Sequence, residues 1–416
     1  MIGRTNALSA AGVELSLVVS VTTGSVVTAT KGSLSVSGTA SDGSVTLKLP
    51  EAGTWSVVAT YNGQTSDTKT VSVVDSYAVV LTFFSATINV TVPSGATVYL
   101  KKGGTTLQTK TSTGTVAFTV TETGTYTVEA TNSSQTTSGS VSVTSATSYA
   151  LTLSFVSSTL NNNEWDVISS VSDAGEGANY WSVGDRKAVV LNGTVGKLSL
   201  SNVTTYAFIL GFNHNSSVEG SGRIHFQLAK TALSGGTDVA LCDSSYGSNV
   251  SSTGYFSMNS SNKNSGGWAS SQMRTNICGT SLSSYSGTII AVIPAALRAV
   301  LKPVTKYTNN TGNSTAASAV TATTDYFFLL SEYEVFGSCT YANANEASKQ
   351  KQYDYYSAGN SKIKYNHSST STAVRWSLRS PIASNSSSFV HVGSGGTVSS
   401  YYGALYSYGF APGLCV

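Results

Sequence analysis

A repeat in the first 155 residues constrains the fold of this chain more than any other feature. Residues Gly53–Ala59 read Gly-Thr-Trp-Ser-Val-Val-Ala, and residues Gly124–Ala130, 71 positions later, read Gly-Thr-Tyr-Thr-Val-Glu-Ala. Around both copies, apolar and polar residues alternate between glycine-rich turns, which is typical of antiparallel sandwich strands. A period of this length gives one small β-sandwich per copy. Because the aromatic residue and the following valine fall on one face, we expect Trp55 and Tyr126 to fill the two cores.

The repeat and a later change in amino-acid composition predict where the domains begin and end. After Asn161–Asn163 come four of the five tryptophans, Asn/Ser-rich insertions separate short apolar strands, and no repeat is found. Only 10% of the residues are charged, but 22 tyrosines argue for a folded chain and against disorder. We therefore expect an attachment arm (1–12), two sandwich modules (13–83 and 84–156) and one larger domain (157–416) of mixed β and irregular structure. The helices expected in it are short: Gly266–Cys278 and Pro294–Val300, where proline suits a first turn.

The charge pattern excludes several classes of partner. The net charge is +3 and no basic run occurs, whereas binding to nucleic acid or an anionic membrane needs a concentrated basic face. No segment reaches the ~18 apolar residues of a membrane span, so we expect no membrane insertion. Binding would depend on neutral polar and aromatic groups, which suit glycans or protein loops.

The two repeated modules resemble the immunoglobulin-like and carboxypeptidase-regulatory-like stalk domains of bacterial surface and phage proteins. The remainder of the chain contains seven further motifs, in this order: Tyr180–Asp185, Ile209–His214, Gly267–Arg274, Ile293–Val304, Phe328–Glu334, Trp376–Pro381 and Gly409–Val416. With these motifs it resembles an uncharacterised domain family of gut-bacterial surface and prophage proteins. That family is similar to the C-type-lectin-like fold of formylglycine-generating enzymes and retroelement variable proteins.

These resemblances imply a fold class and a setting. The fold expected is mostly β, with two tandem immunoglobulin-like sandwiches followed by a C-type-lectin-like α+β domain with short helices. The opening residues Met1–Asn6 resemble the start of phage tail-fibre proteins. We therefore expect a virion location, in a phage tail or surface fibre, with a bacterial cell surface as the alternative. Such binders gain strength by avidity, so we expect contacts with other virion subunits and a homo-oligomer, of which a trimer is one form.

A search for catalytic and metal-binding motifs gives little. His214, His225, His367 and His391 show neither HExxH nor His-x-His spacing. No Gly-x-Ser-x-Gly elbow, P-loop or EF-hand occurs. We expect no enzyme activity, no cofactor and no metal at the histidines. Calcium stays open, since lectin-like loops can bind it through Asn, Asp and carbonyl oxygens.

The four cysteines also lack a catalytic or metal-binding pattern. Cys242, Cys278, Cys339 and Cys415 contain no Cys-x-x-Cys pair. Buried free thiols are the main interpretation, and one or two disulfides are the alternative in an oxidising compartment.

Glu332 and Glu334 are a candidate carboxylate pair. If they lie on a strand, residues two apart point the same way, and a pair of carboxylates can cleave glycosidic bonds or bind calcium or sugar. The flanking segments are strongly apolar, which favours burial and a structural ion pair instead. We expect Glu332 to be buried and paired with Arg274 or Arg379.

The last forty residues are the candidate binding face. They are rich in Tyr, Ser, Asn and Gly, the residues that paratopes favour, because tyrosine brings rigid amphipathic area and Ser and Asn bring adaptable hydrogen bonds. In the retroelement variable proteins that this domain resembles, the ligand face comes from the C-terminal strands and loops. The alternative is that a Ser-rich protein produces such clusters by composition alone. The candidate ligand-binding residues are Tyr401, Tyr402, Tyr406, Tyr408, Asn385, Ser387 and His391.

The function expected from these observations is non-enzymatic receptor binding or adhesion. The C-terminal domain would recognise a host-surface glycan or protein, and the two sandwich modules would carry it. A virion structural or decoration protein is the first alternative. An enzyme that trims surface polysaccharide is the second.

Overall fold

The computed structural model describes residues 15–132 and 135–416, and the chain divides into two compact units, residues 1–155 and 156–416. The protein is mostly β, as predicted. The predicted attachment arm, residues 1–12, lies outside the described residues. In the described part of the chain, none of the helices has the length and apolar character needed to cross a membrane.

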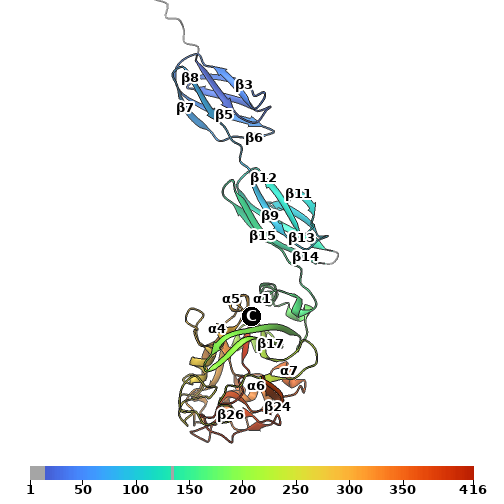
Figure 1. The fold of residues 1–416 in the computed structure, drawn as a ribbon, viewed down its shortest axis with the longest axis vertical. Coiled ribbons are helices and arrows are strands. Elements are labelled where there is room, and N and C mark those ends of the chain that lie inside the picture. Colours follow the sequence, from blue (N-terminus) through green and yellow to red (C-terminus); the bar gives the residue numbers. More distant parts are fainter. Residues whose placement is uncertain (1–14, 133–134) are drawn as a thin grey trace, which may run out of the picture. The chain divides into compact units, whose positions relative to one another are not determined.

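The first sandwich consists of a three-stranded sheet packed against a larger sheet (Figure 1). The smaller sheet has the order β4-β1-β8, with β1 antiparallel to β4 and parallel to β8. The larger sheet has the order β3-β2-β5-β6, and β7 also pairs with β5. The strands are β1 (Ser16–Ser20), β2 (Val26–Lys31), β3 (Leu34–Thr39), β4 (Ser44–Lys48), β5 (Gly53–Tyr61), β6 (Gln64–Thr65), β7 (Lys69–Val73) and β8 (Ser76–Val80).

The second sandwich repeats this pairing. Its first strand, β9, lies antiparallel to β12 and parallel to the last strand, β15, and its other sheet has the order β11-β10-β13-β14. The strands are β9 (Ala86–Thr91), β10 (Thr97–Lys102), β11 (Thr105–Thr111), β12 (Thr115–Val120), β13 (Gly124–Asn132), β14 (Gln135–Val143) and β15 (Ser148–Thr152).

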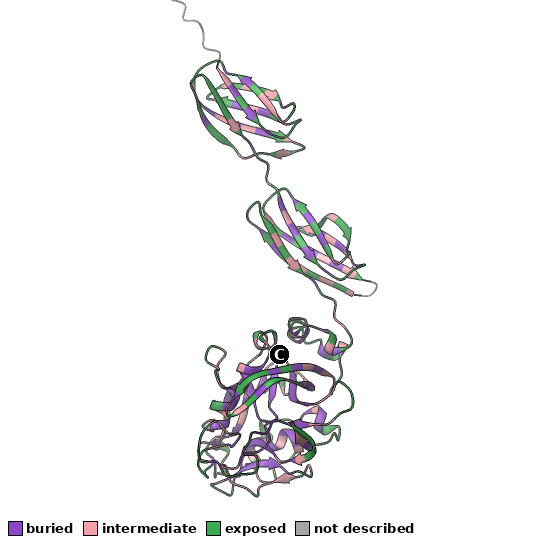
Figure 2. Cartoon of the chain, viewed as in Figure 1, coloured by how far each residue is buried: buried purple, intermediate pink, exposed green. Residues whose placement is uncertain are grey.

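The repeated aromatic residues fill the two cores as predicted. Trp55 is the third residue of β5 and Tyr126 the third of β13, and both are fully buried. Each polar tip donates a hydrogen bond to a carbonyl four residues earlier, Trp55 Nε1 to Glu51 and Tyr126 Oη to Glu122. The burial colours alternate along these strands, which is the period-2 pattern of the sequence (Figure 2).

The C-terminal unit is built on a five-stranded sheet of order β16-β17-β18-β28-β22. Its strands are β16 (Arg186–Val195), β17 (Leu198–Phe212), β18 (Ile224–Lys230), β22 (Phe327–Phe328) and β28 (Gly413–Cys415). The last strand of the chain therefore lies inside the sheet, and this explains why residues 409–416 are all buried. Three smaller sheets complete the β structure: β19 (Val239–Ala240) with β23 (Lys364–Asn366) and β24 (Ser369–Val374), β20 (Val304–Asn309) with β21 (Val320–Asp325), and β25 (Trp376–Pro381) with β26 (Phe389–Val392) and β27 (Val398–Ser399).

The helices of this unit are short, as predicted, but differ in detail from the prediction. The expected helix over Gly266–Cys278 is a π-helical turn at Met273–Cys278 only, while Pro294 does precede a helix, α5. The sequence analysis missed the nine-residue helix α1, where Trp165, Ile168 and Val171 recur at helical spacing and are buried. The helices are η1 (Leu160–Asn162), α1 (Trp165–Asp173), α2 (Gly177–Tyr180), α3 (Ser216–Glu219), η2 (Met273–Cys278), α4 (Ile289–Val292), α5 (Ala295–Ala299), η3 (Ala317–Ala319), α6 (Glu332–Phe336), η4 (Ala344–Ser348) and α7 (Asp354–Ser357).

The four cysteines are free thiols, and all except the partly buried Cys339 lie in the interior. This agrees with the interpretation as small buried hydrophobes. Burial raises the pKa of the Cys242 and Cys415 thiols to about 12, which keeps them protonated and unreactive.

Candidate ligand-binding site

The four tyrosines predicted from the sequence form one aromatic cluster with His391, and we call these five residues the tyrosine cluster. The ring centroids of Tyr401 and Tyr402 lie 4.9 Å apart, and those of Tyr402 and Tyr406 lie 4.6 Å apart. Tyr406 and Tyr408 stack at 6.0 Å, and Tyr408 stacks on His391 at 5.0 Å. The sequence therefore identified a set of side chains that are in contact in space.

The cluster runs from solvent into the interior. Tyr401 is 82% exposed, Tyr402 and Tyr406 are partly buried, and Tyr408 and His391 are only 5% and 2% exposed. The segment that carries these tyrosines is not a regular strand, because residues 400–412 form isolated bridges and turns. Tyr408 cannot offer a ring face to a ligand, since Tyr406 and His391 stack against it.

Polar atoms at the base of the cluster lack well-formed hydrogen bonds within the described residues. These atoms are the Tyr408 hydroxyl and both ring nitrogens of His391, although the backbone of Phe389 interacts weakly with the His391 ring. They line a cavity of ≈ 10 Å³, which is room for about one water molecule or hydroxyl group. Burial, followed by the nearby Arg375, lowers the pKa of His391 to about 4, so its ring is neutral at pH 7.

Asn385 and Ser387 form a local turn that supports the tyrosine segment. The Asn385 side-chain oxygen accepts hydrogen bonds from the Ser387 backbone at 2.6 Å and from the Ser387 hydroxyl at 2.7 Å. This is the local bonding typical of an Asx turn. The carbonyl of Ser387 in turn accepts from the backbone N–H of Ala404 at 2.7 Å. The two residues hold the tyrosine segment in place, and their contact with a ligand stays a prediction.

Arg375 belongs to this site and was missed by the sequence analysis. Its guanidinium carbon lies 4.9 Å from the centre of the Tyr402 ring, and its backbone N–H donates to the Tyr246 hydroxyl at 2.8 Å. Nothing in the local sequence marks it, because Arg375 lies twenty-seven residues before Tyr402 and meets that ring only through the folding of β25 to β27.

A second group of polar residues, fully buried in the C-terminal unit, centres on Glu334. Arg379 donates to both Glu334 oxygens, at 2.5 and 2.9 Å, and the Lys306 ammonium donates to Oε1 at 2.9 Å. Lys306 also bonds Glu219 at 2.6 Å. Burial alone would raise the pKa of Glu334, but Arg379 and Lys306 hold it well below its usual range. Burial raises the pKa of Glu219 to about 7.

The predicted ion pair of Glu332 with Arg274 or Arg379 is wrong, although Glu332 is fully buried as expected. Its carboxylate accepts backbone N–H bonds from residues 340–342 instead. Arg274 pairs with Asp325 at 2.6 Å. The physical reason is that Glu332 and Glu334 open the helix α6, not a strand, so side chains two residues apart point in different directions.

Helix capping fixes the position of Glu334. Ser331 is the N-cap, its hydroxyl accepts from the Glu334 N–H at 3.0 Å, and Glu334 accepts from the Ser331 N–H at 3.0 Å. This is a capping box, and its Ser-x-x-Glu signature was present in the sequence. Both carboxylates of the proposed catalytic pair are thus buried and bonded to protein donors, which leaves neither available for glycoside cleavage.

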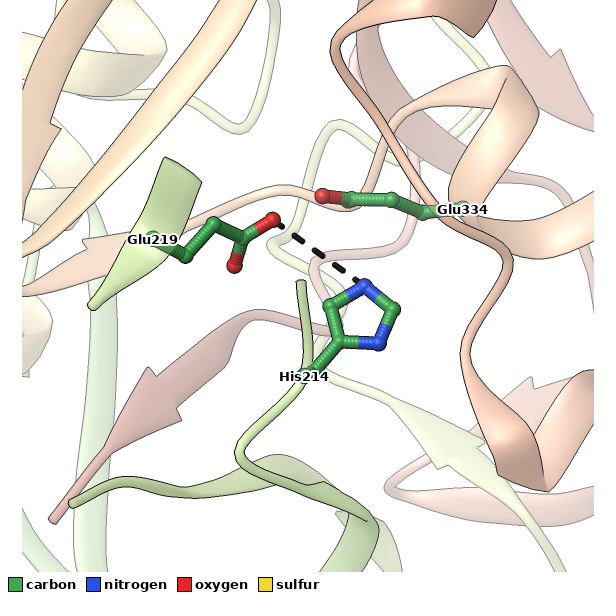
Figure 3. Close-up of side chains that lie close together, drawn as sticks. All are labelled: His214, Glu219 and Glu334. Atoms are coloured by element: carbon green, nitrogen blue, oxygen red, sulfur yellow. Dashed lines mark ion pairs between the residues drawn. The ribbon is translucent and has the colours of Figure 1, made fainter. Parts of the chain in front are cut away.

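His214, Glu219 and Glu334 are the set of described residues best placed to hold a metal ion (Figure 3). Their ligand atoms lie within 4.8 Å of one another, and burial lowers the pKa of His214 to about 3, so its ring is neutral. However, the Lys306 ammonium already donates to both carboxylates. A metal would have to displace a fully buried lysine, and we therefore assign this group a structural role.

Comparison with known proteins finds one family model that matches part of this unit. Residues 248–416 match the family DUF6273, a domain of unknown function. The matched segment contains the tyrosine cluster, Arg375, Glu334 and Arg379. No curated protein matches the chain.

Two solved structures are similar to parts of the chain. One is GBS52, the minor pilin of Streptococcus agalactiae, at 10% identity and a TM-score of 0.23, covering 34% of this chain and 96% of the pilin chain. The other contains the titin Ig tandem domains A164-A165, at 11% identity and a TM-score of 0.11, covering 33% of this chain and 98% of the titin chain. At these TM-scores neither similarity supports a functional conclusion.

Proposed function

We propose that this protein is a non-enzymatic receptor-binding or adhesion protein of a phage tail or bacterial surface. Its C-terminal unit recognises a glycan or protein on the host surface through the tyrosine cluster. The two sandwiches act as an immunoglobulin-like stalk, the C-terminal unit is a lectin-like domain, and the protein works as a homo-oligomer.

One observation carries the proposal: the aromatic ladder from the exposed Tyr401 to the buried Tyr408. An aromatic ring that is 82% exposed contributes little to folding, while the rings behind it are fixed by stacking. Such pre-organised aromatic surfaces are typical hot spots of binding faces, because little entropy is lost when a ligand covers them.

The test is binding of the full chain to glycan arrays and to whole bacterial cells. Tyr401→Ser and Tyr402→Ser should weaken cell binding at least tenfold and leave the melting temperature within about 2 °C of wild type. Tyr77→Ser is the matched control, because Tyr77 is 44% exposed and lies in the first sandwich. Full binding by both cluster variants would move the ligand site elsewhere. Wild-type protein that binds no cell or glycan yet assembles into virions would favour the decoration protein instead.

A further inference from the structure

Arg375 carries a positive charge that the described residues leave without a partner. Its Nε is buried without a hydrogen-bond partner, and no ion pair or side-chain hydrogen bond joins its guanidinium to any residue in the described ranges. Arg298, which also lies over a tyrosine ring, provides a comparison within the same unit. Its guanidinium is 4.6 Å from the Tyr285 centroid and donates to three backbone carbonyls. The guanidinium of Arg298 therefore has a structural role, whereas the N–H groups of the Arg375 guanidinium have no hydrogen-bond acceptor among the described residues.

None of the described carboxylates forms an ion pair with Arg375. The groups whose pKa Arg375 affects include His391, Tyr246 and Tyr408. Burial raises the pKa of Tyr408 and lowers that of His391, so both are neutral at pH 7. Arg375 thus brings a positive charge against the tyrosine cluster, over the Tyr402 ring.

A carboxylate does lie beneath the tyrosine segment, but its oxygens are occupied. Asp243 accepts from the Ser407 hydroxyl at 2.8 and 2.9 Å and from the backbone N–H groups of Phe256 and Ser245. It fixes the backbone between Tyr406 and Tyr408 and makes no bond to Arg375. None of the residues that the structure describes therefore supplies a carboxylate for this guanidinium. A planar guanidinium with free donors binds a carboxylate in a bidentate manner.

A polar cleft next to the cluster indicates what else the ligand carries. The cleft has a volume of ≈ 290 Å³ and is lined by hydroxyl and amide side chains together with one charged residue, Lys263. Gln272, only 8% exposed, lines it with a side-chain oxygen that has no partner in the described chain, while its Nε2 donates to Ser257 Oγ at 2.7 Å. One hydrogen bond joins the cleft to the tyrosine segment. The backbone N–H of Asn259, a residue that lines the cleft, donates to the carbonyl of Ala404, which lies between Tyr402 and Tyr406, at 3.0 Å.

A sugar ring has an apolar C–H face and polar hydroxyl groups, and the aromatic rings and the adjacent polar cleft are complementary to these two features. The rings cover the C–H face of a pyranose, and the cleft offers hydrogen-bond partners for its hydroxyl groups. An acidic peptide would also use Arg375 and could bond the cleft through its amide groups, but a sugar presents many more hydroxyl groups to such a lining and a C–H face to the rings. We propose that the tyrosine cluster, the polar cleft and Arg375 form one site for a saccharide that bears a carboxylate. This inference rests on the binding function proposed above and names its ligand class.

The experiment compares ligands that differ only in the carboxylate. The full chain is titrated with an oligomer of uronic acid, with the same oligomer after reduction of its carboxyl groups, and with a sialylated oligosaccharide before and after removal of the sialic acid. A poly-aspartate peptide of equal charge is the third probe. We expect at least one acidic saccharide to bind tenfold or more tightly than its neutral counterpart and than the peptide.

Variants assign the preference to Arg375. Arg375→Gln should lose at least tenfold in affinity for the acidic saccharide and leave the neutral one within twofold. Arg375→Lys, which keeps the charge but not the paired donors, should fall between. Lys351→Gln is the control, because it removes one positive charge from an exposed position of the same unit. Circular dichroism and melting of each variant verify folding.

Three results would overturn the inference. Equal acidic preference in wild type and in Arg375→Gln and Arg375→Lys removes the role of the arginine. Tighter binding of poly-aspartate than of any saccharide changes the ligand class to an acidic peptide. Binding to cells but to no saccharide also rejects this inference and leaves the proposed function standing, whereas failure to bind cells rejects the proposed function itself.

Discussion

Replacing Glu334 by glutamine tests the buried charge network most directly. Gln is almost the same size as Glu and also completes a capping box, so the helix start at Ser331 is retained. What is lost is the negative charge that two Arg379 nitrogens and the Lys306 ammonium bond. The two buried cations would then face only Glu219 and Glu346, and in the wild type burial raises the pKa of each of these carboxyls to about 7.

The expected cost follows from this geometry. Breaking a buried ion pair by removing one partner costs about 3–5 kcal/mol, because the other charge is left uncompensated. For a unit of this size each kcal/mol lowers the melting temperature by about 2–4 °C, so a drop on the order of 10 °C is expected. Calorimetry of the full chain should show this shift in the C-terminal unit, with the sandwich transitions unchanged.

Glu176→Gln is the matched control, since the same change is made at an exposed position of the same unit. It should change stability by less than about 0.5 kcal/mol. A Glu334→Gln protein that melts within about 1 °C of wild type would refute the reasoning. It would mean that the free energy of the ion pairs is offset by the desolvation of their charges.

Three further predictions concern the sandwiches, the pH dependence and the aromatic cluster. Trp55→Ala and Tyr126→Ala should each destabilise their own sandwich by about 3–5 kcal/mol in urea unfolding, and an unchanged midpoint would contradict their burial. His214→Phe keeps the ring that stacks on Tyr353 at 3.9 Å but cannot titrate. Because the folded pKa of His214 is about 3 and the unfolded value about 6.5, the unfolded state binds its proton first, so wild type loses stability as the pH falls from 6.5 toward 3. Urea melts at pH 4 to 7 should show a smaller acid loss in the variant, and equal slopes would exclude this contribution. Tyr408→Ser should lower the melting temperature, unlike Tyr401→Ser, because only the Tyr408 ring is buried.

The sequence predicted those features that depend on local pattern. The alternation in Gly53–Ala59 and Gly124–Ala130 determined the strands, their inward faces and the two aromatic plugs, because a strand places every second side chain on one face. The Tyr/Ser composition of the C-terminal segment likewise indicated the tyrosine cluster, whose members are close in sequence. In these cases neighbours in the chain are also neighbours in space.

Only the tertiary structure decided which distant groups meet. Glu334 and not Glu332 reaches Arg379, because the two glutamates open a short capped helix that turns their carboxylates apart, whereas on a strand they would point the same way. Tyr401 and Tyr408 belong to one tyrosine-rich stretch, but only Tyr408 is buried, because His391 from β26 stacks on the Tyr408 ring. Arg375 reaches Tyr402 only through the turns between three paired strands. The local sequence pattern sets the direction in which a side chain points from its own helix or strand. Charge pairing and burial depend instead on how distant elements pack against each other, and no local pattern shows this.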